Sequence, residues 1–187
     1  DHGETTFLNE ALDYLKSNNL PIPELKQPLK EDTPIHTGCP GSREMKIERA
    51  ANQESKDLDQ PSELTQWPIQ MHLISPNAPY FKGADLLVAA DCTAFSTGNF
   101  HSKYLRGKKL IIACPKLDDG LKIYAEKIRL LIDEALVNTI TVMIMQVPCC
   151  GGLLSLVEEG VKNANRNVPV KAIVISIEGN VLSEEWI

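Results

Sequence analysis

The sequence has no apolar run of the roughly 18 to 20 residues that a membrane-spanning helix needs, and its N-terminal region has no basic stretch followed by an apolar one. It also has no excess of positive charge, since the formal net charge is -6 and the isoelectric point is about 5.3. Nucleic-acid and membrane-surface binding both depend on basic surfaces. These absences predict a cytoplasmic protein that binds neither nucleic acid nor a membrane.

Cysteine is scarce and odd in number. The chain holds 5 cysteines, which are Cys39, Cys92, Cys114, Cys149 and Cys150. They lack the density and short spacing of a disulfide-stapled secreted domain, and an odd count leaves at least one outside any internal disulfide. In a reducing compartment this pattern favours metal-binding, cluster-binding or catalytic thiols.

A chain of 187 residues is long enough for one sizeable core plus an extension. Apolar residues at helical spacing predict an amphipathic helix over residues 7–20, which ends before Pro21 and Pro23 because proline cannot continue a helix. From Pro21 to Ser62 the composition changes to proline and polar residues, which is typical of an extended arm. We therefore expect an N-terminal helix and arm over residues 1–62 and an α/β domain over residues 63–187.

Four short segments with near-continuous apolar centres predict strands that are covered on both faces, over residues 85–91, 108–114, 139–148 and 170–178. Helical patterns lie between them, at 121–136 and 153–164, with a weaker helix or a helix plus loop at 93–105. A strand, a crossover and a strand, repeated three times, predict an α/β fold. The expected architecture is a parallel, Rossmann-like sheet of about four strands with flanking helices.

The stretch Val147-Pro148-Cys149-Cys150-Gly151-Gly152 joins the third predicted strand to a helix. Backbone N–H groups and the positive end of a helix dipole at such a junction are expected to lower the pKa of a thiol. The two glycines are expected to let the backbone approach a bulky ligand. The alternative interpretation is that both cysteines pack as small buried hydrophobic side chains.

Cysteines also follow the two earlier strands. Cys92 comes after the first strand and Cys114 ends the second, whereas Cys149 and Cys150 follow the third. Because parallel strands bring their carboxyl ends to one edge of a sheet, we expect these four side chains to share that edge, which we call the thiol rim. Thiolates suit an iron-sulfur cluster or zinc and fit magnesium or calcium poorly.

Other polar residues are expected near the thiol rim. Asp91, His101 and Lys116 are candidates for groups that contact the ligands, although a loop histidine without any such role is the alternative. Asp118-Asp119-Gly120 is predicted to form a turn and the N-cap of the following helix. Cys39 lies in the turn-forming island 36–43, which is expected to fold back onto the rim and add a fifth cofactor-binding thiol, with a merely exposed thiol as the alternative.

Several blocks of the sequence resemble the C-terminal domain of the iron-sulfur-binding, ferredoxin-like (4Fe-4S) proteins of anaerobic bacteria. The matching blocks, in chain order, are Gly38-Cys39-Pro40-Gly41-Ser42, Gln66-Trp67-Pro68-Ile69-Gln70, Asn77-Ala78-Pro79-Tyr80-Phe81, residues 84–92, Gly98-Asn99-Phe100-His101, Cys114-Pro115-Lys116-Leu117-Asp118 and Val147-Pro148-Cys149-Cys150-Gly151-Gly152. Members of that family usually carry two four-cysteine ferredoxin motifs before this domain, and this sequence contains neither. The resemblance therefore implies a cluster held by the thiols of the C-terminal domain alone. The cysteine pair before glycine is also similar to the cluster domains of heterodisulfide reductases.

These observations favour a redox or electron-transfer module that binds an iron-sulfur cluster, with a redox partner protein or a ferredoxin domain as its partner. A zinc-dependent enzyme on the same rim is the first alternative. The Cys-x-Asp-x-Arg and His-x-x-Cys motifs of β-carbonic anhydrases are absent, and Gln146 stands three residues before Cys149. A non-catalytic, partner-binding domain with inert cysteines is the second alternative.

Overall fold

The computed structural model describes residues 13–18 and 60–187 of the chain. The chain divides into two units, residues 1–37 and 38–187. In the first unit residues 13–17 are helical, within the predicted helix 7–20, and the rest of that helix lies outside the described residues. The predicted boundary between arm and domain at residue 62 stays a prediction.

The described part of the second unit is an α/β fold, as predicted. Its elements are η2 (Pro79–Phe81), β1 (Asp85–Ala90), α2 (Thr93–Ser96), the π-helical η3 (Phe100–Leu105), β2 (Lys109–Ala113), α3 (Leu121–Asp133), β3 (Thr139–Met145), η4 (Pro148–Cys150), α4 (Gly151–Asn163), β4 (Val170–Ile175) and β5 (Val181–Trp186). The strand order is β2-β1-β3-β4-β5. The first four strands pair in parallel, which confirms the predicted parallel sheet.

The fifth strand is one that the sequence prediction missed. β5 pairs antiparallel with β4 at the edge of the sheet, and most of its residues are exposed. An edge strand of this kind lacks the continuous apolar centre by which the other four were identified. The predicted third strand is also too long, because the chain leaves the sheet after Met145 and enters η4 at Pro148.

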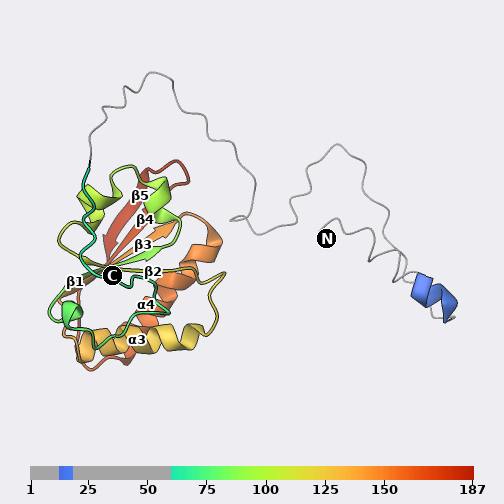
Figure 1. Ribbon diagram of the computed structural model, residues 1–187, viewed down its shortest axis with the longest axis horizontal. Helices are drawn as coiled ribbons and strands as arrows, with labels where there is room; N and C mark the ends of the chain where they lie inside the picture. The colour runs from blue at the N-terminus through green and yellow to red at the C-terminus, as the bar shows by residue number, and fades with distance from the viewer. Residues whose placement is uncertain (1–12, 19–59) are drawn as a thin grey trace, which may run out of the picture. The chain divides into compact units, whose positions relative to one another are not determined.

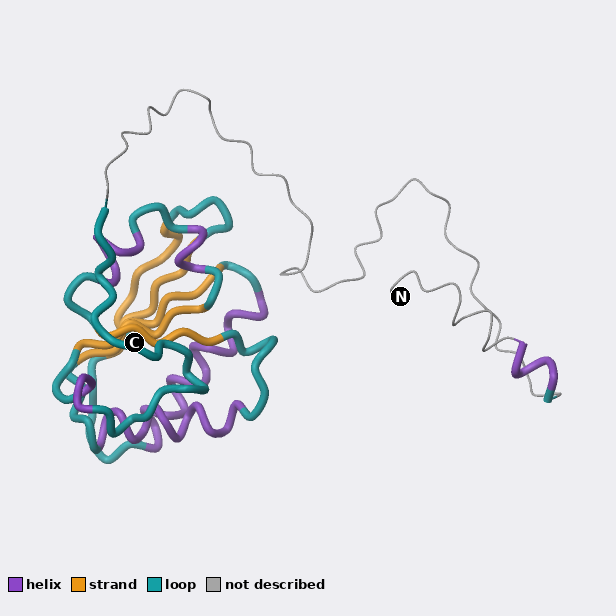
Figure 2. The backbone as a smooth tube through the Cα atoms, viewed as in Figure 1, coloured by secondary structure: helices purple, strands orange, loops and turns teal. Residues whose placement is uncertain are grey.

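The two long helices lie together on one side of the sheet, and the short helices α2 and η3 lie on the other (Figures 1 and 2). α3 presents Tyr124, Ile128 and Leu131 to the core at helical spacing, and each is at most 1% exposed. α4 approaches α3 closely at Gly160, where a Cβ atom would lie 2.6 Å from Ile128. Every residue of β1 from Leu86 to Ala90 is buried, which explains its apolar sequence.

The segment before β1 is fastened to the outer edge of β2. The side-chain amide of Gln66 donates to Leu110 O at 2.6 Å, and the Met71 amide donates to Ile112 O at 2.8 Å. The ammonium of Lys127 on α3 donates to three carbonyl oxygens of the same segment at 2.8–2.9 Å, those of Met71, His72 and Ile74. The bonds to Leu110 and Ile112 occupy a sheet edge that would otherwise be unpaired, and those of Lys127 fasten the segment to α3. In the ranges that the structure describes, no helix has the length and apolar character needed to cross a membrane.

Candidate functional site at the thiol rim

The thiol rim lies at the carboxyl ends of three neighbouring strands. β1 runs directly into Asp91 and Cys92, β2 into Cys114, and β3 reaches Cys149 and Cys150 through the short η4. β1 stands between β2 and β3, so Cys92 occupies the centre of the three positions. The sequence-based placement of these residues on one sheet edge thus agrees with the topology, and their binding role stays a prediction.

The four thiols are free and differ in exposure. Cys92 is exposed, Cys114 and Cys149 are half-buried, and Cys150 is only 5% exposed. Cys92 and Cys150 occupy the N-cap positions of α2 and α4. The site therefore extends from the protein surface into the end of the core.

Burial, followed by the nearby acids Cys114, Asp91 and Cys149, raises the pKa of the Cys92 thiol. The pKa of Cys150 rises to about 11, mainly through burial and further through Cys149 and Cys92, although a backbone hydrogen bond with Met145 acts in the opposite direction. The expectation of a lowered pKa at the strand-to-helix junction is therefore wrong for Cys150. Removal from water and the gathering of several acidic groups outweigh the helix termini.

Electrostatic interactions also link the thiols of the rim to one another. Cys92 interacts electrostatically with Cys114 and Cys149, and Cys150 interacts with Cys149 and Cys92. Every thiol of the rim is thus coupled to at least one other. A cation that bound here would favour the thiolate forms of Cys92 and Cys150.

The loop after β2 is held by a carboxylate. Asp118 Oδ2 accepts a hydrogen bond from the Cys114 amide at 2.9 Å and another from the Tyr124 hydroxyl at 3.0 Å. Burial and this bond raise the pKa of Tyr124 to about 12. The N-cap of α3 falls within the predicted segment 118–120, at Gly120 with a φ of 71°, and it forms no side-chain cap bond. Asp118 instead fixes the backbone of Cys114.

Asp91 directly precedes Cys92, the central thiol of the rim. Burial, and then the charge of Asp118, raises its pKa. Its Oδ1 atom is buried and accepts no hydrogen bond from the residues that the structure describes. An isolated buried carboxylate oxygen is costly, so this atom would gain from a cation or a hydrogen-bond donor placed beside it.

His101 and Lys116 are the other two residues that were predicted to contact the ligands. His101 Nδ1 accepts a hydrogen bond from the Glu63 amide at 3.1 Å, which ties the segment before β1 to η3. His101 and Asp91 both line a mainly apolar cavity of about 220 Å³ beside α2. Lys116 is exposed on the loop after Cys114 and forms no ion pair within the described ranges. Cys39 lies outside the described residues.

The two glycines after Cys150 have different surroundings. A Cβ atom on Gly151 would meet nothing within 4 Å, whereas one on Gly152 would lie 3.1 Å from Pro115. Gly152 therefore lets α4 pack against the loop that carries Cys114, and only Gly151 leaves room for a ligand. This contact brings the ends of β2 and β3 together across β1.

A family model for the Rossmann-like domain matches residues 78–187 of the chain. The chain belongs to this family. An uncharacterized protein of the archaeon Archaeoglobus fulgidus is 29% identical over 119 residues, which are 64% of this chain and 83% of that protein. No solved structure gives a significant match.

Rossmann-like sheets bind ligands in the crevice outside the carboxyl ends of their strands, where the strand order reverses. Here the reversal falls at β1 and β3, which are the strands that lead to Cys92 and to the Cys149-Cys150 pair. The Gly-x-Gly-x-x-Gly fingerprint of dinucleotide-binding members is absent from the sequence. In this Rossmann-like domain the position of a cofactor crevice is occupied by thiols.

The present arrangement of the side chains does not form a metal site in the described residues. Within residues 13–18 and 60–187, no group of three or more His, Cys, Asp or Glu side chains is set up to hold a metal ion. To bind a single metal ion, the thiols would have to turn toward one another. A larger group, such as a cluster, could instead bridge sulfur atoms that lie farther apart. Thiols together with one unpaired buried carboxylate form a donor set that suits a soft cation.

Proposed function

We propose that the thiol rim of this Rossmann-like domain binds an iron-sulfur cluster and that the domain is a redox or electron-transfer module. The observation that carries the proposal is the gathering of four electrostatically coupled thiols, from the ends of three adjacent strands, at the edge where this fold binds ligands. When bound, such a cluster supplies reversible electron transfer at a potential set by its surroundings.

The donor set supports a thiolate-bound group. Cys92, Cys114, Cys149 and Cys150 provide sulfur ligands, and soft metals prefer these to oxygen. Neighbouring residues such as Cys149 and Cys150 are awkward as two ligands of one zinc ion. In a cluster each can bind a different iron, so the pair suits a polynuclear group better than a single ion. The resemblance of the blocks around these cysteines to iron-sulfur-binding proteins of anaerobic bacteria supports the same choice.

Residues of the chain itself would orient the ligands and limit access of water. Asp118 holds the Cys114 backbone, and the buried Tyr124 hydroxyl holds Asp118. Gly152 holds α4 against Pro115, which fixes the spacing between the second and third ligand loops. Because Cys92 and Cys150 carry raised pKa values, both have to release protons when a metal binds.

The surface around the rim supports contact with a partner protein. Phe95, on the helical turn after Cys92, is 93% exposed, and Leu117, on the loop after Cys114, is 80% exposed. Exposed apolar side chains beside a functional site are typical of interaction surfaces. We propose that they contact a redox partner or a ferredoxin domain in the cytoplasm.

The test is anaerobic reconstitution with iron and sulfide, followed by metal and sulfide analysis and visible absorbance. The wild-type protein is expected to become coloured and to hold iron and sulfide in equal amounts, whereas a Cys149→Ser, Cys150→Ser variant is expected to lose the cluster. Cys39→Ser tests the separate prediction that a fifth thiol contributes to the cluster. Equal loading of the wild-type protein and the double variant would refute the proposal, and colourless protein with one zinc per chain would support the zinc alternative.

A further inference from the structure

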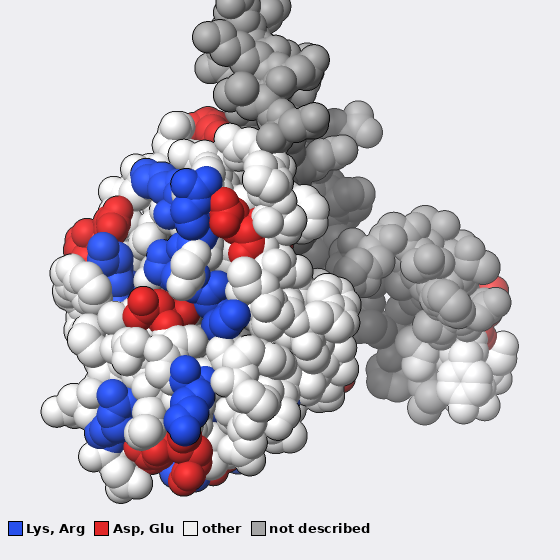
Figure 3. Space-filling view, turned by 60° about the vertical axis from the view of Figure 1, so that its left-hand side comes forward, with Lys and Arg blue, Asp and Glu red and all other residues white. Residues whose placement is uncertain are grey.

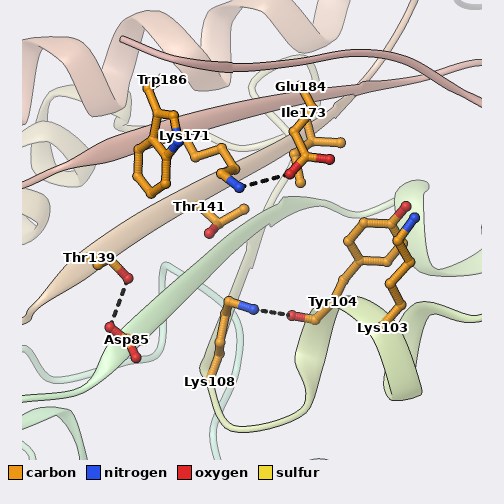
Figure 4. A pocket seen from close by; sticks show the side chains of 10 residues that line it. All are labelled: Asp85, Lys103, Tyr104, Lys108, Thr139, Thr141, Lys171, Ile173, Glu184 and Trp186. Atoms are coloured by element: carbon orange, nitrogen blue, oxygen red, sulfur yellow. Dashed lines mark hydrogen bonds and ion pairs between the residues drawn. The ribbon is translucent and has the colours of Figure 1, made fainter.

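A second candidate site lies on the side of the sheet opposite α3 and α4. Successive side chains of a strand point to opposite faces. Val170 shares a shallow cavity with Glu158 and Val161 of α4, so the next residue, Lys171, points to the other side. There a pocket of about 280 Å³ opens over the strands, and Figure 4 shows the side chains that line it.

Charged groups from separate parts of the chain meet in this lysine pocket. Its lining includes three lysines and two carboxylates, which are Lys103, Lys108, Lys171, Asp85 and Glu184. Two aromatic residues form its walls. Tyr104 is buried, whereas Trp186 is 63% exposed. Figure 3 shows one side of the molecule, on which lysine and arginine side chains gather with acidic side chains among them. The net charge of -6 makes such a local cluster unusual for this chain.

The existing contacts leave donor capacity in the pocket. Lys171 Nζ pairs with Glu184 Oε1 at 2.7 Å, and Lys108 Nζ donates to Tyr104 O at 3.0 Å. Lys103 Nζ lies 5.0 Å from the centre of the Tyr104 ring. An ammonium has three N–H donors, so these contacts leave several free to bind a ligand.

The two carboxylates play different parts. Asp85 Oδ1 accepts a hydrogen bond from the Thr139 hydroxyl at 2.8 Å, which places that oxygen at the strand ends. Glu184 stands among the lysines: its hydrogen bond with Lys171, and then the charges of Lys171 and Lys103, lower its pKa. Glu184 therefore occupies, from within the protein, the position that an external oxyanion would prefer.

We propose that the lysine pocket binds a small oxyanion ligand, with carboxylate or phosphate groups, that competes with Glu184 for Lys171 and Lys103. Lys108 forms the third contact, and Trp186, whose ring centre lies 4.7 Å from Lys171 Nζ, lies beside the ligand. The pocket lies toward the amino ends of β1, β3 and β4, whereas the thiols lie at the carboxyl ends. The proposal is thus independent of the iron-sulfur proposal and holds or fails separately.

The experiment uses the full chain in a Trp67→Phe background. The protein has two tryptophans, and Trp67 lies outside the pocket, so this change leaves Trp186 as the single indole reporter. Its fluorescence is followed while pyrophosphate, citrate or sodium chloride of matched ionic strength is added. Pyrophosphate represents phosphates and citrate represents carboxylates, so a difference between them identifies the preferred group.

Three substitutions test the assignment of roles. Lys103→Gln is expected to weaken binding about fivefold, because it removes one full charge at the site. Glu184→Gln is expected to strengthen binding by a similar factor, because it removes the internal competitor. Lys122→Gln, on the exposed surface of α3, is the charge-matched control and is expected to leave the affinity unchanged.

A saturable fluorescence change with either anion below about 1 mM, together with these opposite effects of the two pocket variants, would support the proposal. A response no larger than that to sodium chloride would overturn it. So would equal losses in Lys103→Gln and Lys122→Gln, or weaker binding in Glu184→Gln, since either result would mean that general charge or local structure controls the response.

Discussion

At the carboxyl ends of β1, β2 and β3 the chain gathers thiols and carboxylates, whereas the lysine pocket toward the amino ends joins three ammonium groups to two carboxylates. The charges of the lysine pocket compensate one another, as the pairing of Lys171 with Glu184 shows. At the rim, the charges that shift Cys92, Cys150 and Asp91 all come from other acids. The lysine pocket is therefore stable with its side chains charged, whereas the surroundings of the rim favour the neutral forms of Cys92, Cys150 and Asp91 unless a cation is added.

The largest expected effect concerns the turn between β4 and β5. Gly179, between β4 and β5, has a φ of 95°, and a Cβ atom there would lie 2.2 Å from Ser96 O on α2. Gly179→Ala is expected to lower the free energy of unfolding by about 3 kcal/mol, through backbone strain and overpacking. Denaturant unfolding would measure this loss.

Gly98→Ala is the matched control for that change. Gly98 follows the same α2 segment, has no positive φ, and a Cβ atom there would meet nothing within 4 Å. A stability change within about 0.5 kcal/mol is expected. Similar losses in both variants would mean that the contact between the turn and α2 is not the cause.

The second prediction concerns how the free energy of unfolding depends on pH through the Cys150 thiol of the rim. The folded pKa of Cys150, about 11, is above the ordinary value of 9.0, so the folded state binds this proton more tightly than the unfolded state does. The stability that the neutral thiol provides is fully present below pH 9.0 and is lost as the pH rises to about 11. We expect unfolding experiments across this window to show a loss of up to about 2 kcal/mol.

Cys150→Ala is expected to remove most of that pH dependence. Tyr124, whose folded pKa is about 12, acts in the same direction at still higher pH, so Tyr124→Phe should flatten only the most alkaline part of the curve. An unchanged slope in Cys150→Ala would show that this thiol does not titrate as described.

The third prediction concerns metal uptake by the thiol rim under anaerobic conditions. Binding of cobalt or zinc, used as probes, must displace protons from thiols with raised pKa values. The apparent affinity is expected to rise about tenfold or more per pH unit between pH 6 and 8, with one factor of ten for each proton released. Anion binding in the lysine pocket should not rise with pH over this range, and metal binding that is independent of pH would contradict the predicted protonation of the rim.

The smallest expected effect concerns the apolar residues that flank the rim. Phe95→Ser and Leu117→Ser are expected to slow electron transfer from a reduced ferredoxin by a few-fold, because contacts at the edge of an interface contribute little individually. Cluster content should not change, since neither side chain is a ligand. Lost cluster content, or an equal effect of exposed Leu182→Ser on β5, would argue against a docking role.

The sequence predicted the parts of the fold that depend on burial. Continuous apolar runs identified β1 to β4, and their parallel order followed from the crossovers. β5 was missed because an exposed edge strand is specified by its partner, β4, rather than by its own apolar pattern. The edge contacts of Gln66 were missed for a similar reason, since a side-chain amide that binds a strand leaves no periodic signal.

At the candidate site the sequence placed the four thiols on one edge, but the predicted lowering of the Cys150 pKa was wrong. The pKa of Cys150 depends on how deeply η4 sits in the core, and that of Cys92 on its burial and then on how near the neighbouring acids lie. Neither distance can be obtained from spacing along the chain. The lysine pocket was not foreseen because its groups come from η3, from the loop before β2 and from strands at the far edge of the sheet.

The reversed direction of β5 has a practical consequence for experiments. The chain turns back from the carboxyl edge at Gly179, and the Ile187 amide donates to Val170 O, at the first residue of β4. A tag, a surface linker or a fluorescent protein joined after Ile187 would therefore leave the domain at the end of β4 remote from the cysteines. Immobilisation through such a fusion would present the thiol rim outward, toward an electrode or a partner in solution.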